Sequence, residues 1–229
     1  MLSSNVRPVL GGLQRAYVEA IKSSVSRFAS GKKMIGYVHL WTGTHEETSV
    51  ELQKAVHSLR DCDAIILDLR NGYGGAWWDH LDPFYKNTSS YFKATWIERN
   101  GKKSDTFSER KKNRDSYNRP MAVLINEGVR SGKEALAFQF KKTKRALLIG
   151  TKTAGFFVAG GAYFRETELP YFLYLSSKGL LLDGVNLEGH GIEPDISVPF
   201  STDQSLESDP QLEKAKEVLK RKIKGQEII

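Results

Sequence analysis

Two glycine-rich segments carry the residues that could do chemistry. The first, residues 68–75 (DLRNGYGG), follows an apolar run. A glycine-rich turn after a buried strand exposes backbone N–H groups, which can bind a phosphate or an oxyanion. The segment lacks the Gly-Lys-Ser/Thr ending of a P-loop and the spacing of a dinucleotide-binding fingerprint. It is therefore either a tight structural turn or an anion-binding turn.

The second segment, residues 126–134 (NEGVRSGKE), places Ser131 between an apolar strand and a helix. The hydroxyl of Ser131 would project from the turn as a nucleophile does. The N–H of Gly132 would lie at the helix N-terminus, where a developing negative charge is favoured. Ser131 and Glu134 also have the spacing of a capping box. The spacing alone leaves both a nucleophile and a helix cap open.

The elements that must position these segments alternate between strands and helices, which predicts an α/β fold with a mostly parallel sheet flanked by helices. In such sheets, sites form at the carboxyl ends of strands, where both glycine-rich segments begin. Strands are expected at 33–41, 64–69, 91–97, 121–125, 146–150, 162–166 and 171–176. Helices are expected at 44–60, opened by a Thr44/Glu47 capping box, and at 76–85, 131–142 and 209–222.

The first 33 residues are expected to form an N-terminal amphipathic helix, because apolar residues recur at three- and four-residue intervals from Val9 to Phe28. The remainder, residues 34–229, is interpreted as one compact domain. Residues 1–12 lack the charged-then-apolar layout of a secretory signal.

The composition narrows the function classes. The chain has 229 residues and a formal net charge of +7, from 34 Lys and Arg against 27 Asp and Glu. The basic residues lie in short runs without a nucleic-acid-binding motif, so no nucleic-acid partner is expected. Cys62 is the single cysteine, which excludes an internal disulfide and a multi-cysteine zinc site. The sequence contains no run of 18 apolar residues, so no transmembrane segment is predicted.

Six sequence blocks carry a family resemblance. They are IGYVHLW (35–41), LDLRNGYGG (67–75), VLINEGVRSGKE (123–134), LIGTKTAG (148–155), LEGHGIEPDISV (187–198) and DPQLEKA (209–215). Together they resemble the C-terminal processing (tail-specific) protease family, which includes the tricorn protease core; they occur in the family's order and span roughly residues 34–215. This resemblance implies a ClpP/crotonase-like core and a serine endopeptidase that acts on polypeptides through an acyl-enzyme, with no metal or organic cofactor.

The resemblance assigns roles residue by residue. Ser131 corresponds to the nucleophile, three places before the glutamate of the helix-opening motif. The oxyanion donors correspond to the N–H groups of Gly132 and of Gly74 or Gly75. Glu188 corresponds to the acidic residue that supports the histidine in tricorn-like members.

The sequence departs from both known ways of activating that serine. In lysine-type members a lysine follows the glycine of the T-x-G turn, but Phe156 stands there and cannot accept a proton. In tricorn-like members the base is a histidine from a segment before the core and its PDZ module. Only about 33 residues precede the first core strand, so no PDZ module is expected in this chain. The tricorn-like mechanism is favoured, with its base supplied by residues outside the chain.

Within the chain, His39 is the candidate base, because its strand leads to the expected site edge. A lone histidine in a strand is also typical of a packed core residue. Lys133 is expected to point elsewhere on its helix, and His80 is expected on a helix surface.

Two aromatic residues are candidates for substrate binding. Trp77 adjoins Trp78, and one element cannot easily bury both, so Trp77 is expected to line a groove with Phe156. The resemblance implies that substrates are gripped as extended peptides near their carboxyl ends. Two alternatives remain: a catalytically silent member that binds peptides or lipids, and an anion-binding protein. Relatives often work in the cell envelope, while the oligomeric state stays open.

Overall fold

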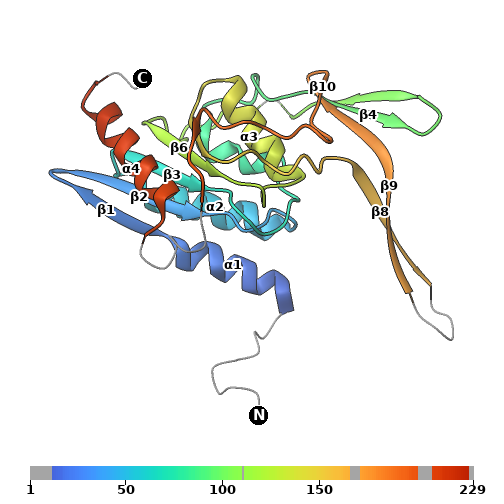
Figure 1. Cartoon of the computed structure of the whole chain (residues 1–229), viewed down its shortest axis with the longest axis horizontal. Coiled ribbons are helices and arrows are strands. Elements are labelled where there is room, and N and C mark those ends of the chain that lie inside the picture. Colours follow the sequence, from blue (N-terminus) through green and yellow to red (C-terminus); the bar gives the residue numbers. More distant parts are fainter. Residues whose placement is uncertain (1–11, 110, 166–170, 201–207, 227–229) are drawn as a thin grey trace, which may run out of the picture.

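The computed structural model describes residues 12–109, 111–165, 171–200 and 208–226, and its main element is a six-stranded sheet (Figure 1). The strand order is β1-β2-β3-β6-β7-β11, in which only β1 is antiparallel to its neighbour. This arrangement confirms the predicted α/β fold with a mostly parallel sheet. The strands are β1 (Ser26–Ser30), β2 (Lys33–His39), β3 (Ala64–Asp68), β6 (Met121–Ile125), β7 (Leu147–Gly150) and β11 (Ile196–Ser197).

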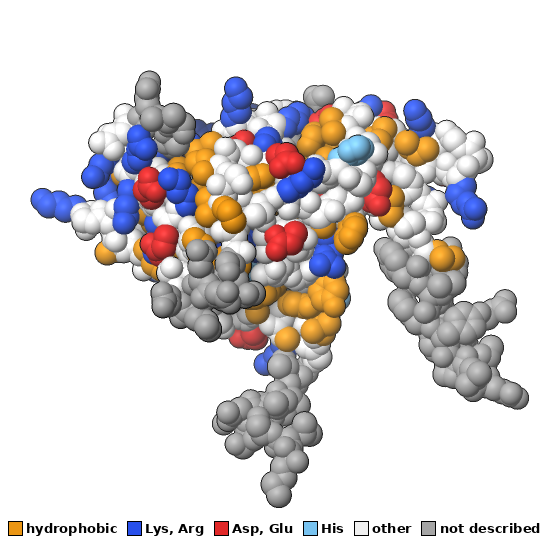
Figure 2. All heavy atoms as spheres, viewed as in Figure 1, with side chains coloured by type: hydrophobic (Ala, Val, Ile, Leu, Met, Phe, Trp, Pro, Cys, Tyr) orange, Lys and Arg blue, Asp and Glu red, His pale blue; other side chains and the backbone are white. Residues whose placement is uncertain are grey.

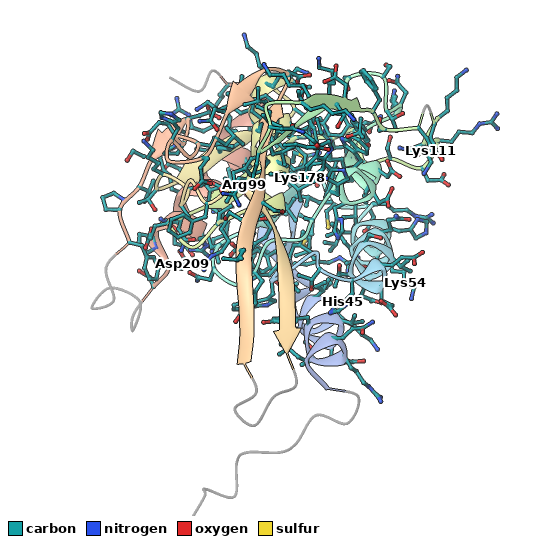
Figure 3. The ribbon with its side chains drawn as sticks, turned by 90° about the vertical axis from the view of Figure 1, so that its right-hand side faces the viewer. His45, Lys54, Arg99, Lys111, Lys178 and Asp209 are labelled. Atoms are coloured by element: carbon teal, nitrogen blue, oxygen red, sulfur yellow. The ribbon has the colours of Figure 1, made fainter. Side chains whose placement is uncertain are left out.

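Helices cover both faces of this sheet. The central strands β3 and β6 are buried along their whole length, as their continuous apolar sequences predict for parallel strands. Side chains alternate between two cores: Ile65 packs with α1 (Gly12–Ser24), α2 (Glu46–Ser58) and α3 (Gly132–Lys142), whereas Ile66 packs with α4 (Pro210–Ile223). In Figure 3, Lys54 on α2 and Asp209 at the start of α4 accordingly lie on opposite sides of the molecule.

A second sheet lies beside the first and has the order β10-β9-β4-β5, with β8 paired to β9. The β8–β9 hairpin projects well beyond the rest of the fold (Figures 1 and 3). Within the described residues no helix is long and apolar enough to cross a membrane. The strands are β4 (Ala94–Glu98), β5 (Lys103–Thr106), β8 (Ala159–Arg165), β9 (Tyr171–Leu182) and β10 (Val185–Asn186).

The N-terminal helix is shorter than predicted. It ends at Ser24, and the apolar residues beyond it belong to β1, which forms a hairpin with β2. Phe28 packs edge-on against Tyr37 of β2, 6.2 Å between ring centroids, and Gly31 adopts a φ of 62° at the reversal. The expected helical segment of residues 1–33 therefore contributes a strand to the sheet. Residues 1–11 lie outside the described residues.

Two further helix predictions were wrong in detail. The helix expected from Thr44 begins at Glu46, because Thr44 packs against the glycine-rich turn at Gly75. Instead of one helix over 76–85 there are two short 3-10 turns, η1 (Trp78–His80) and η2 (Asp82–Phe84). Pro83 explains the break, since it has no N–H for a helical hydrogen bond.

His80, predicted on a helix surface, is buried instead. Its Nδ1 accepts from the Trp77 N–H at 3.3 Å, and its Nε2 lies 3.1 Å from the Thr48 hydroxyl. Burial lowers the pKa of His80 to about 4, so the ring is neutral and structural at physiological pH.

A buried ion network joins β3 to α4. Arg70 donates to Asp68, at 2.6 Å from Nη2, and to Asp209, also at 2.6 Å. Asp209 in turn caps α4 by accepting from the Leu212 N–H. Burial opposes the charge of Arg70, but the two carboxylates outweigh it and raise its pKa. The network therefore gives Asp68 and Arg70 a structural role, which is to tie the end of β3 to the start of α4.

Charges of both signs are interspersed over the face shown in Figure 2. Several lysines there and elsewhere form ion pairs, such as Lys142 with Asp183 and Lys152 with Glu193. Among the described residues of this face, acidic side chains thus stand between the basic ones.

Replacing Arg70 with methionine is expected to lower the free energy of unfolding by about 3–5 kcal/mol, because it leaves the Asp68 carboxylate buried without its cation. Urea denaturation measures this change. Arg27→Met is the control, since Arg27 pairs with Asp61 at the surface and its loss should matter far less. Equal losses in the two variants would contradict the role given to the network.

Candidate active site

Three chain segments meet at the carboxyl edge of the parallel sheet. They follow β2, β3 and β6, and hydrogen bonds hold them together. The Tyr73 N–H donates to the Trp41 carbonyl at 3.0 Å, and the Asn71 N–H donates to the Asn126 side-chain oxygen at 3.1 Å. Because the second bond joins the two predicted glycine-rich segments, they lie at one place, as the strand-end argument expected.

Ser131 sits at the start of α3 with its side chain exposed to solvent. Its backbone has φ 53° and ψ −131°, a conformation that costs a non-glycine residue about 1–3 kcal/mol. The N–H of Ser131 donates to the Phe156 carbonyl at 2.8 Å and to the Glu134 carboxylate at 3.1 Å. The surroundings therefore hold the serine in a strained, solvent-exposed turn at the start of α3.

Glycines allow the turn after β3 to approach this serine closely. A Cβ on Gly74 would lie 2.5 Å from the Ser131 Cβ and 3.0 Å from its Oγ, and a Cβ on Gly132 would lie 2.0 Å from the Ala76 carbonyl oxygen. Among the described residues, nothing accepts a hydrogen bond from the N–H of Gly74, Gly75 or Gly132. Unpaired amides beside an exposed serine are what an oxyanion hole requires.

Glu134 ties the nucleophile turn to the loop after β7. Its buried carboxylate accepts from the Thr153 hydroxyl at 2.6 Å and from the N–H groups of Gly155, Phe156 and Ser131 at 2.7, 3.1 and 3.1 Å. The four hydrogen bonds favour the charged form of Glu134, but burial outweighs them and raises its pKa. The sequence predicted Glu134 only as a motif residue and part of a capping box. Its hydrogen bonds to residues 153–156 were not predicted.

Lys133, expected to point elsewhere, is fully buried in the site region. Its Nζ donates to the carbonyls of Trp41, at 3.2 Å, and of Asn71. Burial lowers the pKa of Lys133 to about 7. No signal in the sequence identified this residue, because a lysine at a helix start is ordinarily solvent-exposed.

The candidate base His39 is not bonded to Ser131. It is 7% exposed, its ring stacks on Trp41 at 3.9 Å, and its Nε2 is 2.9 Å from the Arg70 carbonyl oxygen. Burial lowers its pKa. In this conformation His39 is a packed residue at the edge of the site. The sequence had left this open as the alternative to a catalytic base.

Glu188 is bonded to backbone rather than to a histidine. Its carboxylate accepts from the N–H groups of Phe157 and Val158, and no described histidine hydrogen-bonds to it. Glu188 therefore anchors the loop that also carries Phe156. The Phe156 side chain is 62% exposed, while its backbone braces Ser131.

Trp77 lies in an aromatic cluster rather than free in the site. Its ring centroid is 5.3 Å from that of Trp78, 5.1 Å from Phe92 and 6.3 Å from Trp96. Both adjacent tryptophans are half-buried, so each keeps part of its ring accessible. Within the described residues, no group of three His, Cys, Asp or Glu side chains could hold a metal ion.

An exposed serine on a strained strand-to-helix turn, with a glycine of a second turn packed against it, is the kind of arrangement that serine hydrolases use. Comparison with known proteins identifies the family: the sequence model of Peptidase family S41 matches residues 34–198. The chain belongs to this family of serine peptidases.

Curated relatives agree with this assignment. The chain is 29% identical over 168 residues to a probable CtpA-like serine protease of Staphylococcus haemolyticus, covering 70% of this chain and 33% of that protein. It is 29% identical over 147 residues to the chloroplastic carboxyl-terminal-processing peptidase 2 of Arabidopsis thaliana, covering 62% and 28%. The chain thus spans about a third of the length of these relatives.

Solved structures share the fold. The photosystem II D1 C-terminal processing protease matches with a TM-score of 0.59 and 20% identity, over 86% of this chain and 52% of that one. The tricorn protease matches with a TM-score of 0.57 and 20% identity, over 92% and 19%. The resemblance stated from the sequence blocks is confirmed.

Glu134→Gln is expected to destabilise the protein by about 1–3 kcal/mol, because an amide nitrogen would face backbone donors that now share the carboxylate. Urea denaturation measures the loss. Glu127→Gln is the matched control, since Glu127 is exposed and bonds only the Thr151 hydroxyl, which a glutamine can also do. Equal stability of the two variants would contradict the bridging role.

Proposed function

We propose that this chain is the core of a serine endopeptidase that hydrolyses polypeptides through an acyl-enzyme on Ser131. The observation that carries the proposal is the exposed, strained Ser131 with Gly74 against it, where the N–H groups of Gly74 and Gly132 have no acceptor among the described residues. A side chain at Gly74 would close this space. Membership of family S41 and the names of the curated relatives support a peptide as the substrate.

In the proposed reaction, Ser131 Oγ attacks the peptide carbonyl while its proton passes to a base. The new C–O bond leaves a negative charge on the carbonyl oxygen, which the N–H groups of Gly132 and of Gly75 or Gly74 stabilise. The C–N bond then breaks, and the amine leaves with the proton. Water releases the acyl group by the reverse sequence, and no metal or organic cofactor is required.

We propose a tricorn-like source for the base rather than a lysine after the T-x-G turn. Phe156 occupies that place, and no described lysine or histidine side chain hydrogen-bonds to Ser131 Oγ. His39 is the alternative, but its Nε2 would first have to leave the Arg70 carbonyl. A histidine from polypeptide outside the described residues could accept the proton while His39 keeps its bond to the Arg70 carbonyl.

We propose an extended polypeptide with apolar side chains as the substrate. Phe156, 62% exposed, and Tyr73, 56% exposed, stand on two loops that meet at Ser131, and Trp77, three residues after Gly74, is half-buried. Apolar side chains of a substrate would cover these rings.

A catalytically silent, peptide- or lipid-binding member is the second candidate. Phe156 in the place of the lysine, together with His39 bonded to the Arg70 carbonyl, favours it. The strained backbone of Ser131 argues against it, because strain of this kind is typical of functional sites.

Intact-mass labelling with a fluorophosphonate tests the proposal, measured on this chain and on the full-length natural protein. On the full-length protein we expect one adduct, which Ser131→Ala abolishes and His39→Gln leaves, whereas this chain alone should not form it if the base lies outside it. An adduct on this chain would place the base within it, and loss of that adduct in a folded His39→Gln would assign the base to His39. Peptide binding without any adduct, unchanged in Ser131→Ala, would overturn the peptidase in favour of the silent module.

A further inference from the structure

Lys133 is a buried cation that the proposed chemistry does not use. It lies two residues after the nucleophile, is 0% exposed, and extends beneath the glycine-rich turn. Its Nζ donates to the carbonyls of Trp41, at 3.2 Å, and Asn71. Burying a lysine costs free energy, so the two hydrogen bonds that it donates are expected to have a role that an apolar side chain could not fill.

These two carbonyls belong to the segments that follow β2 and β3. The Trp41 carbonyl also accepts from the Tyr73 N–H at 3.0 Å, and the Asn71 side chain accepts from Asn126 at 2.9 Å. Lys133 thus links α3, which carries Ser131, to the turn that carries Gly74, directly at Asn71 and through Trp41, which is hydrogen-bonded to Tyr73 of that turn. A shift of this turn would move its amides relative to Ser131 Oγ.

We propose that Lys133 is a positioning residue whose Nζ, bonded to the carbonyls of Trp41 and Asn71, holds the glycine-rich turn over Ser131 so that its amides meet the oxyanion. This inference rests on the proposed function, because it assigns a role within the same site. Lys133 does not act as the base: its Nζ is bonded to two backbone carbonyls and has no hydrogen bond to Ser131 Oγ among the described contacts.

The protonated form is the one that braces the turn. An ammonium offers three donors and a charge that carbonyl dipoles favour, whereas a neutral amine donates more weakly. Asp68 favours the charge of Lys133 and Arg130 opposes it, while His39 and Arg70 lie on the adjoining strand ends. Because burial lowers the pKa of Lys133 to about 7, both forms are populated near neutral pH.

The first test compares rates of fluorophosphonate labelling at Ser131 between pH 6 and 9. We expect Lys133→Met to slow labelling about 10- to 100-fold, with little change in the concentration that half-saturates the rate. Lys152→Met is the control, since Lys152 is an exposed lysine of a site loop paired with Glu193. The ratio of the wild-type rate to the Lys133→Met rate should fall as pH rises through 7. A ratio that rises would make Lys133 the base, and equal rates would remove any role; either result overturns the proposal.

The second test does not depend on a reactive serine, so it separates failure of this inference from failure of the proposed function. Hydrogen exchange of the Asn71 and Tyr73 amides, both hydrogen-bonded in the turn, should be faster in Lys133→Met, with α4 unchanged. If that variant does not fold, the wild type alone suffices: after correction for intrinsic exchange, these amides should lose protection between pH 6 and 9. Unchanged protection of these two amides would contradict the proposed role of Lys133 in holding the turn.

Discussion

The buried carboxylate of Glu134 is the interaction on which the site depends. It accepts four hydrogen bonds, from the Thr153 hydroxyl and from the amides of Ser131, Gly155 and Phe156. The turn at Ser131 follows β6 and the loop follows β7, so one side chain joins two strand ends. Because the left-handed backbone of Ser131 is costly, it persists only where contacts of this kind outweigh the cost. Glu134 therefore helps to fix the backbone of Ser131, the proposed nucleophile.

The second constraint is the close packing of backbone on backbone. Gly74 lies against Ser131, and Gly132 lies against the Ala76 carbonyl, at distances that exclude any side chain. The Gly74 and Gly132 amides, proposed oxyanion donors, have no acceptor among the described residues. Lys133 bonds to the Asn71 carbonyl of the same turn and to the Trp41 carbonyl beside it. Under the proposed function, the oxyanion donors and the nucleophile are therefore both supported by α3.

Much of this architecture could be predicted from the sequence. The apolar strands at 64–68 and 121–125 are buried on both faces, and their ends brought the glycine-rich turn and Ser131 together as expected. The burials of Lys133 and His80 could not be predicted, because each depends on partners far away in the chain, Trp41 for one and Thr48 for the other. β1 was missed for a related reason: its apolar residues continue the helical spacing of α1 and pair with β2 only in the folded sheet. His39 shows the limit of reasoning from strand position, since the direction of its ring is decided by the Arg70 carbonyl.

The most direct measurement is a crystal structure of the protein after phosphonylation. The account predicts a bond between Ser131 Oγ and phosphorus, with the phosphoryl oxygen within hydrogen-bonding distance of the Gly132 N–H and of the Gly75 or Gly74 N–H. A phosphoryl oxygen that faces solvent, or an adduct on another residue, would contradict the assignment of these glycines and of Ser131.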